Sequence, residues 1–183
     1  MPNTTIGTTT VMTMTTTDPG DPVHAKALSA LEALGIEYEC LPHPAVYTIE
    51  EMAALRLPHS EAIAKNLFLQ DDKKQNFYLV TLRGERRANL RRLQQDLGSR
   101  KLSFAGEETL SRVLGLSKGA VTPLGILNDE ERQVRAVFDR SYGDKDLIGV
   151  HPLQNTATVF LKMGDLARLV RAHGNPLTFL DFV

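Results

Sequence analysis

The fold of this chain depends on the stretch NLFLQDDKKQNFYLVTL, residues 66–82. Residues 66–69 and 77–82 are short runs rich in Leu, Val, Phe and Tyr, and the polar run 71–76 lies between them. Short apolar and aromatic runs bounded by polar turn residues are typical of β-strands. We therefore predict two strands joined by a turn at 71–76.

A helix is predicted upstream of this hairpin. Apolar residues recur at helical spacing over residues 23–34, with Asp21 as the N-cap and Pro22 at the first helical position. Gly35 is the stop signal, because glycine readily adopts the left-handed conformation that ends many helices. Residues 36–40 then alternate between apolar and polar, which predicts a short strand.

Two further helices carry their own start signals. Residues 48–51, TIEE, match a capping box and open a helix through Leu55. Asn89 can cap a second helix, in which the spacing turns Arg91 and Arg92 outward. Its inward-facing residues are Leu90, Leu93 and Leu97.

Beyond residue 100 the pattern again mixes helices and strands. The expected elements are a helix at 106–114 stopped by Gly115, a Gly/Pro-rich loop at 115–125, strands at 134–138 and 156–161, and a helix capped by Asp165 and running to Val170.

These interspersed elements predict an α+β (mixed α/β) fold without the regular strand–helix repeat of a doubly wound sheet. The 183 residues suffice for one full hydrophobic core. We expect a single domain at residues 21–183, with helices around one curved, mixed and largely antiparallel sheet. Residues 1–20 contain nine threonines and Pro/Gly punctuation, and we predict a disordered leader there.

Composition excludes several classes of protein. No apolar run approaches the ~20 residues of a membrane span, and no secretory signal pattern is present. Cys40 is the single cysteine, so an internal disulfide is excluded, and its place at the end of a predicted strand favours a structural thiol. A cytoplasmic protein with no membrane or DNA partner is expected.

The charge balance limits any RNA contact to a local patch. The net charge is −1, whereas proteins that grip nucleic acid usually carry a positive excess. Residues 83–92 hold five arginines and one acid, and arginines gain affinity for phosphates by releasing counterions. The alternative interpretation of this stretch is a solvated helix face. The candidate RNA-binding residues are Arg86, Arg87, Arg91 and Arg92.

Common catalytic motifs are missing from the sequence. It contains no P-loop, no GxGxxG fingerprint and no GxSxG elbow. His43, His59 and His151 are scattered and lack neighbouring thiolates or carboxylates, so no metal or cofactor is expected. The residue patterns alone predict a mixed α/β domain of unknown role.

Three segments in order carry a resemblance to a known family. Over residues 24–180 the chain resembles the YbaK/prolyl-tRNA-synthetase-associated editing domain family. Within it, the chain is most similar to the free-standing PrdX or ProXp-ala branch, which clears alanine from tRNA for proline. The segments are KNLFL at 65–69, LGLSKGAVTPL at 114–124 and HPLQNTATV at 151–159, preceded by LGI at 34–36 and HPAV at 43–46.

The resemblance implies the editing-domain fold and hydrolysis of the ester in mischarged Ala-tRNA(Pro). The implied partner is the aminoacylated acceptor end of tRNA, with prolyl-tRNA synthetase as a second candidate, and the arginine patch becomes a candidate tRNA contact. Lys65 matches the family's essential lysine, while Gly119 and Pro123 match its GxxxP loop. The implied substrate-binding residues are Asn66, Gly119, Ala120, Val121, Thr122, Pro123 and His151.

Two positions depart from the family pattern. Lys118 stands where proline is expected, and Ala120 stands where serine is usual. The first change can alter the rigidity of the loop or add a positive charge near the RNA. The second removes a hydroxyl group, so the side chain at this position takes no part in hydrogen bonding.

The implied reaction needs no strong nucleophile, because an aminoacyl ester is already an activated acyl group. A lysine ammonium is a cation at neutral pH and a poor general base. We therefore expect Lys65 to act electrostatically, on the ester oxygen or on the phosphate of the terminal adenosine. The turn at 119–123 can direct N–H groups at the carbonyl oxygen, and a small pocket would exclude proline by steric clash.

Other interpretations remain open. The chain can be a deacylase for another small amino acid, such as Cys or Ser, or a non-catalytic module that binds tRNA ends or a synthetase. It can also be an amino-acid-binding or hydrolytic protein without RNA contact. A lysine before an apolar strand is most often a surface residue, so Lys65 owes its assignment to the ordered motifs around it.

Overall fold

The computed structural model describes residues 22–182, which contain five α-helices, two short 3-10 helices and eight strands. Their bounds in chain order are α1 Pro22–Ala33, β1 Tyr38–Pro42, α2 Ile49–Ala54, η1 Ser60–Ala62, β2 Ala64–Asp71, β3 Phe77–Arg83, α3 Leu90–Leu97, β4 Leu102–Phe104, α4 Glu107–Leu114, η2 Pro123–Asn128, β5 Val134–Asp139, β6 Leu147–Val150, β7 Ala157–Lys162, α5 Met163–His173 and β8 Leu177–Leu180.

The predicted hairpin is present and forms the middle of the larger sheet. β2 and β3 pair antiparallel in a five-stranded sheet of order β4-β2-β3-β5-β8, in which β3, β5 and β8 run parallel. The Asp71 carboxylate closes the turn by accepting from Gln75 N at 2.9 Å and from Asn76 Nδ2 at 2.6 Å. Both strands extend past their predicted ends into polar residues that the apolar pattern does not mark.

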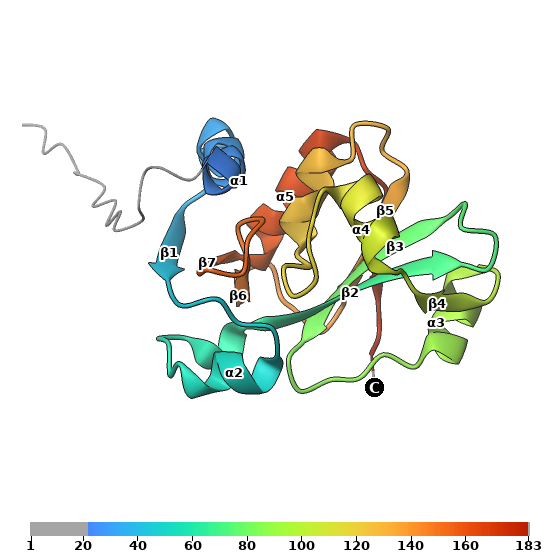
Figure 1. Ribbon diagram of the computed structural model, residues 1–183, viewed down its shortest axis with the longest axis horizontal. Coiled ribbons are helices and arrows are strands. Elements are labelled where there is room, and N and C mark those ends of the chain that lie inside the picture. Colours follow the sequence, from blue (N-terminus) through green and yellow to red (C-terminus); the bar gives the residue numbers. More distant parts are fainter. Residues whose placement is uncertain (1–21, 183) are drawn as a thin grey trace, which may run out of the picture.

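Helices cover both faces of the larger sheet. Phe68 and Leu79 belong to the main core, which also contains apolar residues of α4 and α5. Leu69 and Val80 point to the opposite face, which Leu93 of α3 covers in a smaller core. Both faces are therefore buried, which explains why β3 reads as a nearly continuous apolar run rather than an alternating one. Figure 1 shows α2 and α3 at opposite ends of the hairpin.

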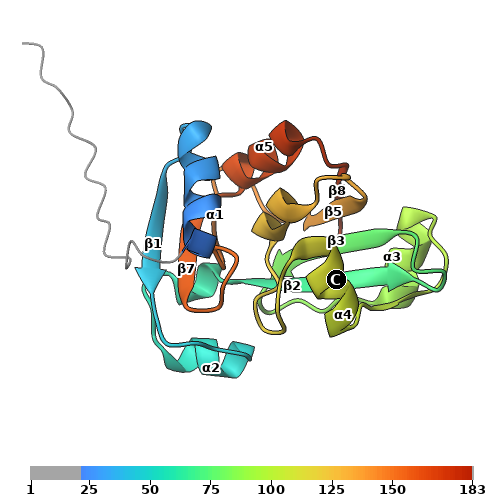
Figure 2. The same ribbon diagram turned by 45° about the horizontal axis from the view of Figure 1, so that its top comes forward.

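A second, three-stranded antiparallel sheet of order β1-β7-β6 lies beside the start of β2. An isolated parallel bridge between Ile63 and Gly149 joins the two sheets. Figure 2 shows β1, β7 and α1 grouped at one side of the molecule, with the long β2–β3 hairpin extending away from them. The bridge thus brings the first residues of β2 next to the end of β6.

Three of the predicted helix signals act as expected. Thr48 Oγ1 accepts from Glu51 N at 3.1 Å, which confirms the cap of α2. Asn89 Oδ1 accepts from the N–H groups of Arg91 and Arg92, both at 3.1 Å, and caps α3. Gly115 ends α4 with φ +60°. These signals are local, since each depends on residues within one helical turn.

Several sequence predictions need correction. Asp165 does not cap the last helix, because α5 begins at Met163 with Lys162 as its N-cap; Asp165 lies in the first turn and accepts from Arg168 at 2.8 Å. The strands form two sheets rather than one. Strands β4, β6 and β8 were not predicted, because each has only three or four residues and too few apolar positions to show a period.

The predicted leader at 1–20 and the predicted N-cap Asp21 lie outside the described residues. Within residues 22–182, no helix is long and apolar enough to cross a membrane.

Candidate active site

A pocket of about 360 Å³ opens where the two sheets meet. The start of β2, the segment entering α2, the loop after α4 and the end of β6 all contribute to its walls. This size is at the small end of the ~300–1,000 Å³ that is usual for small-molecule sites. Its apolar walls come from Val46, Met52, Ile63, Leu67, Val121 and Val150.

Lys65 and Asn66 line this pocket from adjacent positions on β2. The half-buried Lys65 sends its Nζ to the backbone oxygen of Arg86, to which it donates at 2.6 Å. The Asn66 side chain is held differently: its Oδ1 accepts from Thr81 Oγ1 at 2.9 Å. Since Asn66 and Thr81 are paired across the hairpin, the register of the strands orients the amide.

The loop after α4 contributes Gly119 and Val121 to the pocket. Ala120 N donates to Ser117 O at 3.1 Å, and Gly119 has φ +84°, the positive value that the third residue of a type II turn requires. A Cβ at Gly119 would lie 2.8 Å from Cδ1 of Tyr47. In the described part of the chain, the N–H groups of Gly119 and Val121 donate to no protein acceptor.

The other predicted loop residues lie behind the pocket wall. Ala120, Thr122 and Pro123 are buried and do not line the cavity. Thr122 Oγ1 donates to the backbone oxygen of His151 at 2.6 Å and thereby ties the loop to the end of β6. Pro123 begins η2. These residues support the wall, so direct substrate contact is expected of Gly119 and Val121 instead.

His151 lines the pocket with a neutral imidazole. Burial lowers the pKa of His151 below its ordinary 6.5, and the hydrogen bond to the Ala157 oxygen opposes this effect; electrostatic repulsion between two protonated rings at His43 and His151 would add to the lowering. Because a carbonyl oxygen only accepts, the 2.9 Å contact with Ala157 O identifies Nδ1 as the protonated nitrogen. The other nitrogen, Nε2, has no protein partner among residues 22–182 and is an acceptor.

The sequence did not mark the polar layer behind His151. His43 Nδ1 contacts Pro44 O at 2.8 Å, so its Nε2 accepts from the hydroxyl of Thr158 at 3.0 Å. Thr158 lines the pocket, and the His43 ring lies 5.9 Å from that of His151. Tyr47, which also lines the pocket, was not predicted as a site residue from the sequence. The sequence feature that could have identified this polar layer is the His-Pro pair that occurs at both 43–44 and 151–152. The pairing of β1 with β7 brings the two pairs together in the fold.

The candidate tRNA-binding arginines differ in their surroundings. Arg87, Arg91 and Arg92 are exposed, although Arg92 Nε lies 3.6 Å from the carboxylate of Asp96 in the same helix. Arg86 is only 33% exposed and is paired inside the protein with Asp139. The structure thus leaves three of the four guanidinium groups facing solvent.

Lys118, which departs from the family pattern, does not line the pocket. The Lys118 side chain is 82% exposed, with Nζ 3.8 Å from Glu107, so this departure from the family pattern points into solvent at the second position of the turn. Across residues 22–182, no three His, Cys, Asp or Glu side chains gather in a way that could hold a metal ion.

The fold and pocket define a small α+β domain that offers a fixed cation, unpaired backbone N–H groups and a neutral imidazole to one small ligand. Comparison with known proteins then gives the family. Residues 43–169 match the family described as aminoacyl-tRNA editing domain. The chain belongs to this family of YbaK/ProX-type editing domains.

Relatives of similar length support this membership. The chain is 44% identical to the "Prolyl-tRNA editing protein ProX" of Acetoanaerobium sticklandii, over 84% of this chain and 94% of the relative. It is 37% identical to the "Prolyl-tRNA synthetase associated domain-containing protein 1" of Mus musculus, over 89% and 98%. A crystal structure described as a candidate trans-editing enzyme for prolyl-tRNA synthetase has the same fold, with a TM-score of 0.67, 21% identity and coverage of 88% and 97%.

Substitution of Gly119 tests whether the turn shapes the pocket. Gly119→Ala is expected to lose about 1–2 kcal/mol of unfolding free energy, because an L-residue is strained at positive φ, and to displace Tyr47 at the pocket rim. Gly98→Ala is the matched control, since Gly98 has φ +59° but nothing within 4 Å of the added Cβ. Urea unfolding should show similar losses in both variants. Deacylation that falls equally in both would contradict a role for the turn.

The lowered pKa of His151 predicts a pH dependence of stability. Between the folded-state pKa and the ordinary 6.5, the unfolded chain binds a proton that the folded protein does not, so stability increases with pH in this window. The free energy of unfolding should therefore fall between pH 7.5 and pH 5, and His151→Gln should show a smaller fall. Urea titrations at both pH values measure this difference, and an equal fall in both proteins would refute the assignment.

Proposed function

We propose that this protein is a free-standing aminoacyl-tRNA hydrolase that removes alanine from mischarged Ala-tRNA(Pro). The observation that carries the proposal is that Lys65, His151 and the turn residues Gly119 and Val121 line one small pocket; in residues 22–182 the N–H groups of Gly119 and Val121 donate to no acceptor. The family membership supports an aminoacyl-tRNA substrate. The name of the Acetoanaerobium sticklandii relative, which refers to prolyl-tRNA editing, supports tRNA for proline.

The pocket supplies what ester hydrolysis requires. Water adds to the ester carbonyl carbon, negative charge develops on the carbonyl oxygen, and the bond to the terminal ribose oxygen breaks to give alanine and deacylated tRNA. The N–H groups of Gly119 and Val121 can donate to the developing oxyanion, and the Lys65 ammonium stabilises negative charge on the ester or the adjoining phosphate. Hydrogen-bond donors that are already in position before the reaction lower the activation barrier, because no groups have to reorganise as the charge develops.

His151 and Asn66 suit supporting parts in this reaction. The neutral imidazole of His151 presents Nε2 as an acceptor, which can orient the attacking water or a ribose hydroxyl. Asn66 holds its side-chain oxygen toward Thr81 and so leaves its amide N–H₂ to donate to substrate. Each group has one orientation set by a protein partner, and this fixed geometry favours reaction of a correctly placed ester.

The size and lining of the pocket favour a small aliphatic acyl group. Six of the fifteen lining residues are Val, Ile, Leu or Met, and among residues 22–182 no carboxylate lines the cavity to bind an extended polar side chain. Alanine presents one methyl group to these walls, whereas the proline ring would clash with them. Rejection by clash can exceed the ~1–3 kcal/mol gained by filling a pocket with one methylene. Serine adds only a hydroxyl group and should be rejected less strongly.

The surface near the pocket fits the end of a tRNA. Tyr47 lines the pocket and is 66% exposed, so its ring is available to stack on the terminal adenine. Arg87, Arg91 and Arg92 follow β3, whose last residues pair with the start of β2, and can contact acceptor-stem phosphates. Prolyl-tRNA synthetase is a further candidate partner, which would supply the mischarged tRNA.

A deacylation panel tests the proposed function. Wild-type protein is expected to hydrolyse Ala-tRNA(Pro) faster than the Cys, Ser and Pro esters. Lys65→Ala should lose about a hundred- to thousand-fold in kcat, the usual effect of removing one electrostatic group at the reacting oxygen. Lys73→Ala, at an exposed position in the turn of the same hairpin, is the matched control. A near-normal rate for Lys65→Ala would exclude the catalytic assignment. Hydrolysis of the Cys ester faster than that of the Ala ester would identify cysteine as the preferred aminoacyl group.

Tyr47 gives a separate prediction about tRNA binding. Tyr47→Ala should raise KM by roughly 5- to 150-fold, because stacking on one base contributes ~1–3 kcal/mol, while kcat changes little. Tyr47→Phe should restore KM, since the ring provides the stacking surface. Phe104→Ala, which removes another exposed ring at 61% exposure, is the control. Single-turnover kinetics at varied enzyme concentration measure both constants, and an unchanged KM for Tyr47→Ala would rule out stacking.

A further inference from the structure

The Lys65 ammonium is held by a backbone carbonyl rather than by an acidic side chain. Nζ donates to the oxygen of Arg86 at 2.6 Å. Nothing else in residues 22–182 accepts a hydrogen bond from this ammonium. A lysine side chain has four rotatable bonds and samples many positions when its head group is free. The position of the Arg86 carbonyl therefore determines where the catalytic cation lies.

The turn that carries this carbonyl lies against the pocket. Arg86 N donates to Arg83 O at 3.0 Å and closes a turn at residues 83–86. A Cβ at Gly84 would lie 2.9 Å from the backbone oxygen of Ile63, so the turn packs directly on a pocket-lining residue. The side chains at 85 and 87 are exposed. The side chains that can fix the turn are therefore Arg83 at its start and Arg86, the residue whose own peptide oxygen holds the ammonium.

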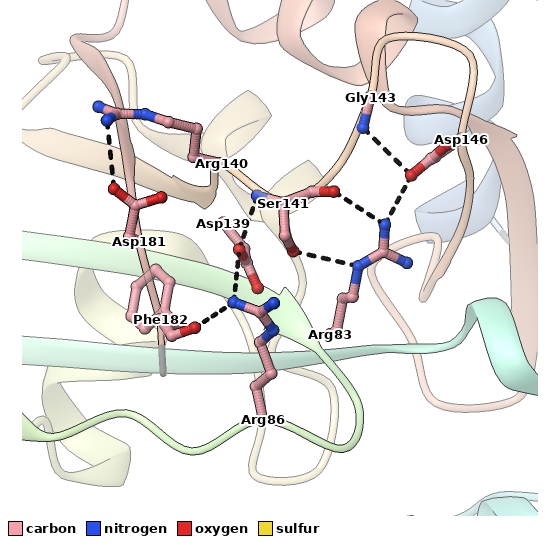
Figure 3. Close-up of polar contacts among 9 residues, drawn as sticks. All are labelled: Arg83, Arg86, Asp139, Arg140, Ser141, Gly143, Asp146, Asp181 and Phe182. Carbon is pink, nitrogen blue, oxygen red and sulfur yellow. Dashed lines mark hydrogen bonds and ion pairs between the residues drawn. The ribbon is translucent and has the colours of Figure 1, made fainter.

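Figure 3 shows how the Arg86 side chain fixes the turn to two other segments. Its guanidinium lies 3.5 Å from Asp139 Oδ1 at the end of β5, and Nη1 donates to the backbone oxygen of Phe182 after β8. Asp139 is fully buried; its Oδ1 also accepts from Ser141 N at 2.9 Å, whereas its Oδ2 has no hydrogen-bond partner among the described residues. A buried carboxylate is costly without a cation, so this pairing is strongly favoured.

Neighbouring arginines are engaged elsewhere. Figure 3 shows Arg83 donating to Ser141 and Asp146, and Arg140 donating to Asp181. Arg86 is therefore the arginine that compensates Asp139, and its guanidinium faces the protein interior rather than a phosphate.

We propose that Arg86 is a positioning residue for Lys65: its side chain, clamped between Asp139 and the Phe182 carbonyl, holds the peptide oxygen that places the catalytic ammonium. This inference rests on the proposed hydrolase function. It gives Arg86 a part different from the tRNA contact expected of the arginine-rich stretch. Without the Arg86 side chain, the peptide carbonyl of residue 86 is still present, but the turn that carries it is free to move. A shift of about 1 Å in a catalytic group can cost roughly a hundred-fold in rate.

The test is single-turnover hydrolysis of Ala-tRNA(Pro) by the full chain at several salt concentrations. Arg86→Ala is expected to lower kcat by roughly 10- to 100-fold with KM and its salt dependence unchanged. Arg86→Lys should recover part of kcat, because an ammonium can still pair with Asp139 but cannot also reach Phe182 O. Asp139→Asn should lower kcat in the same direction by a smaller factor.

Two arginine variants serve as comparisons. Arg140→Ala removes a paired arginine that lies outside the 83–86 turn, and its kcat should match that of wild type. Arg87→Ala removes an exposed arginine and should raise KM with a weaker salt dependence, the response of a phosphate contact. If Arg86→Ala fails to fold because Asp139 is left unpaired, the double variant Arg86→Ala/Asp139→Asn removes both groups and should show the same loss of kcat.

The outcomes separate this inference from the proposed function. Wild-type protein that hydrolyses none of the aminoacyl esters would overturn the function itself. An active wild type with an inactive Lys65→Ala and a fully active, folded Arg86→Ala would overturn only the positioning role. An Arg86→Ala variant with raised KM, normal kcat and weaker salt dependence would show that Arg86 binds phosphate. A lower melting temperature with normal kcat would make Arg86 merely structural.

Discussion

The register of the β2–β3 hairpin is the constraint on which the site depends. It places Lys65 beside the last residues of β3, so that the turn carrying the Arg86 carbonyl begins within reach of the ammonium. The bridge between Ile63 and Gly149 attaches the same point to the smaller sheet and so brings β6 to the pocket. A shift of one residue would send Lys65 to the opposite face of the sheet, and the cation would leave its acceptor.

Buried hydrogen bonds then fix the chemical state of the pocket. The Ala157 carbonyl holds the proton of His151 on Nδ1, and Thr122 ties the backbone of the same residue to the glycine turn. His43 orients the Thr158 hydroxyl. An unsatisfied buried polar group costs roughly 1–3 kcal/mol, so these partners strongly favour one arrangement. The resulting site combines a fixed cation with a neutral acceptor, which suits electrostatic stabilisation of an ester undergoing attack by water.

Local signals predicted much of the fold, and long-range pairing decided the remainder. The caps at Thr48 and Asn89 and the stop at Gly115 were predicted because each acts within one helical turn. The short strands β4, β6 and β8 were not, since three or four residues become a strand only when a neighbour supplies hydrogen bonds. Asp165 was mistaken for a cap because an acidic residue is equally favourable in the first turn of a helix.

The sequence by itself determined the hairpin and three of the helix ends, and the order of its motifs led to the expectation that Lys65 and the Gly119 loop form the site. Tertiary structure decided which residues line the pocket and which partner each charged side chain contacts. Arg86 and Arg87 are identical in type and adjacent in sequence, yet one pairs with buried Asp139 and the other faces solvent. No local pattern separates them, because the carboxylate that distinguishes them comes from a distant strand that only folding brings alongside.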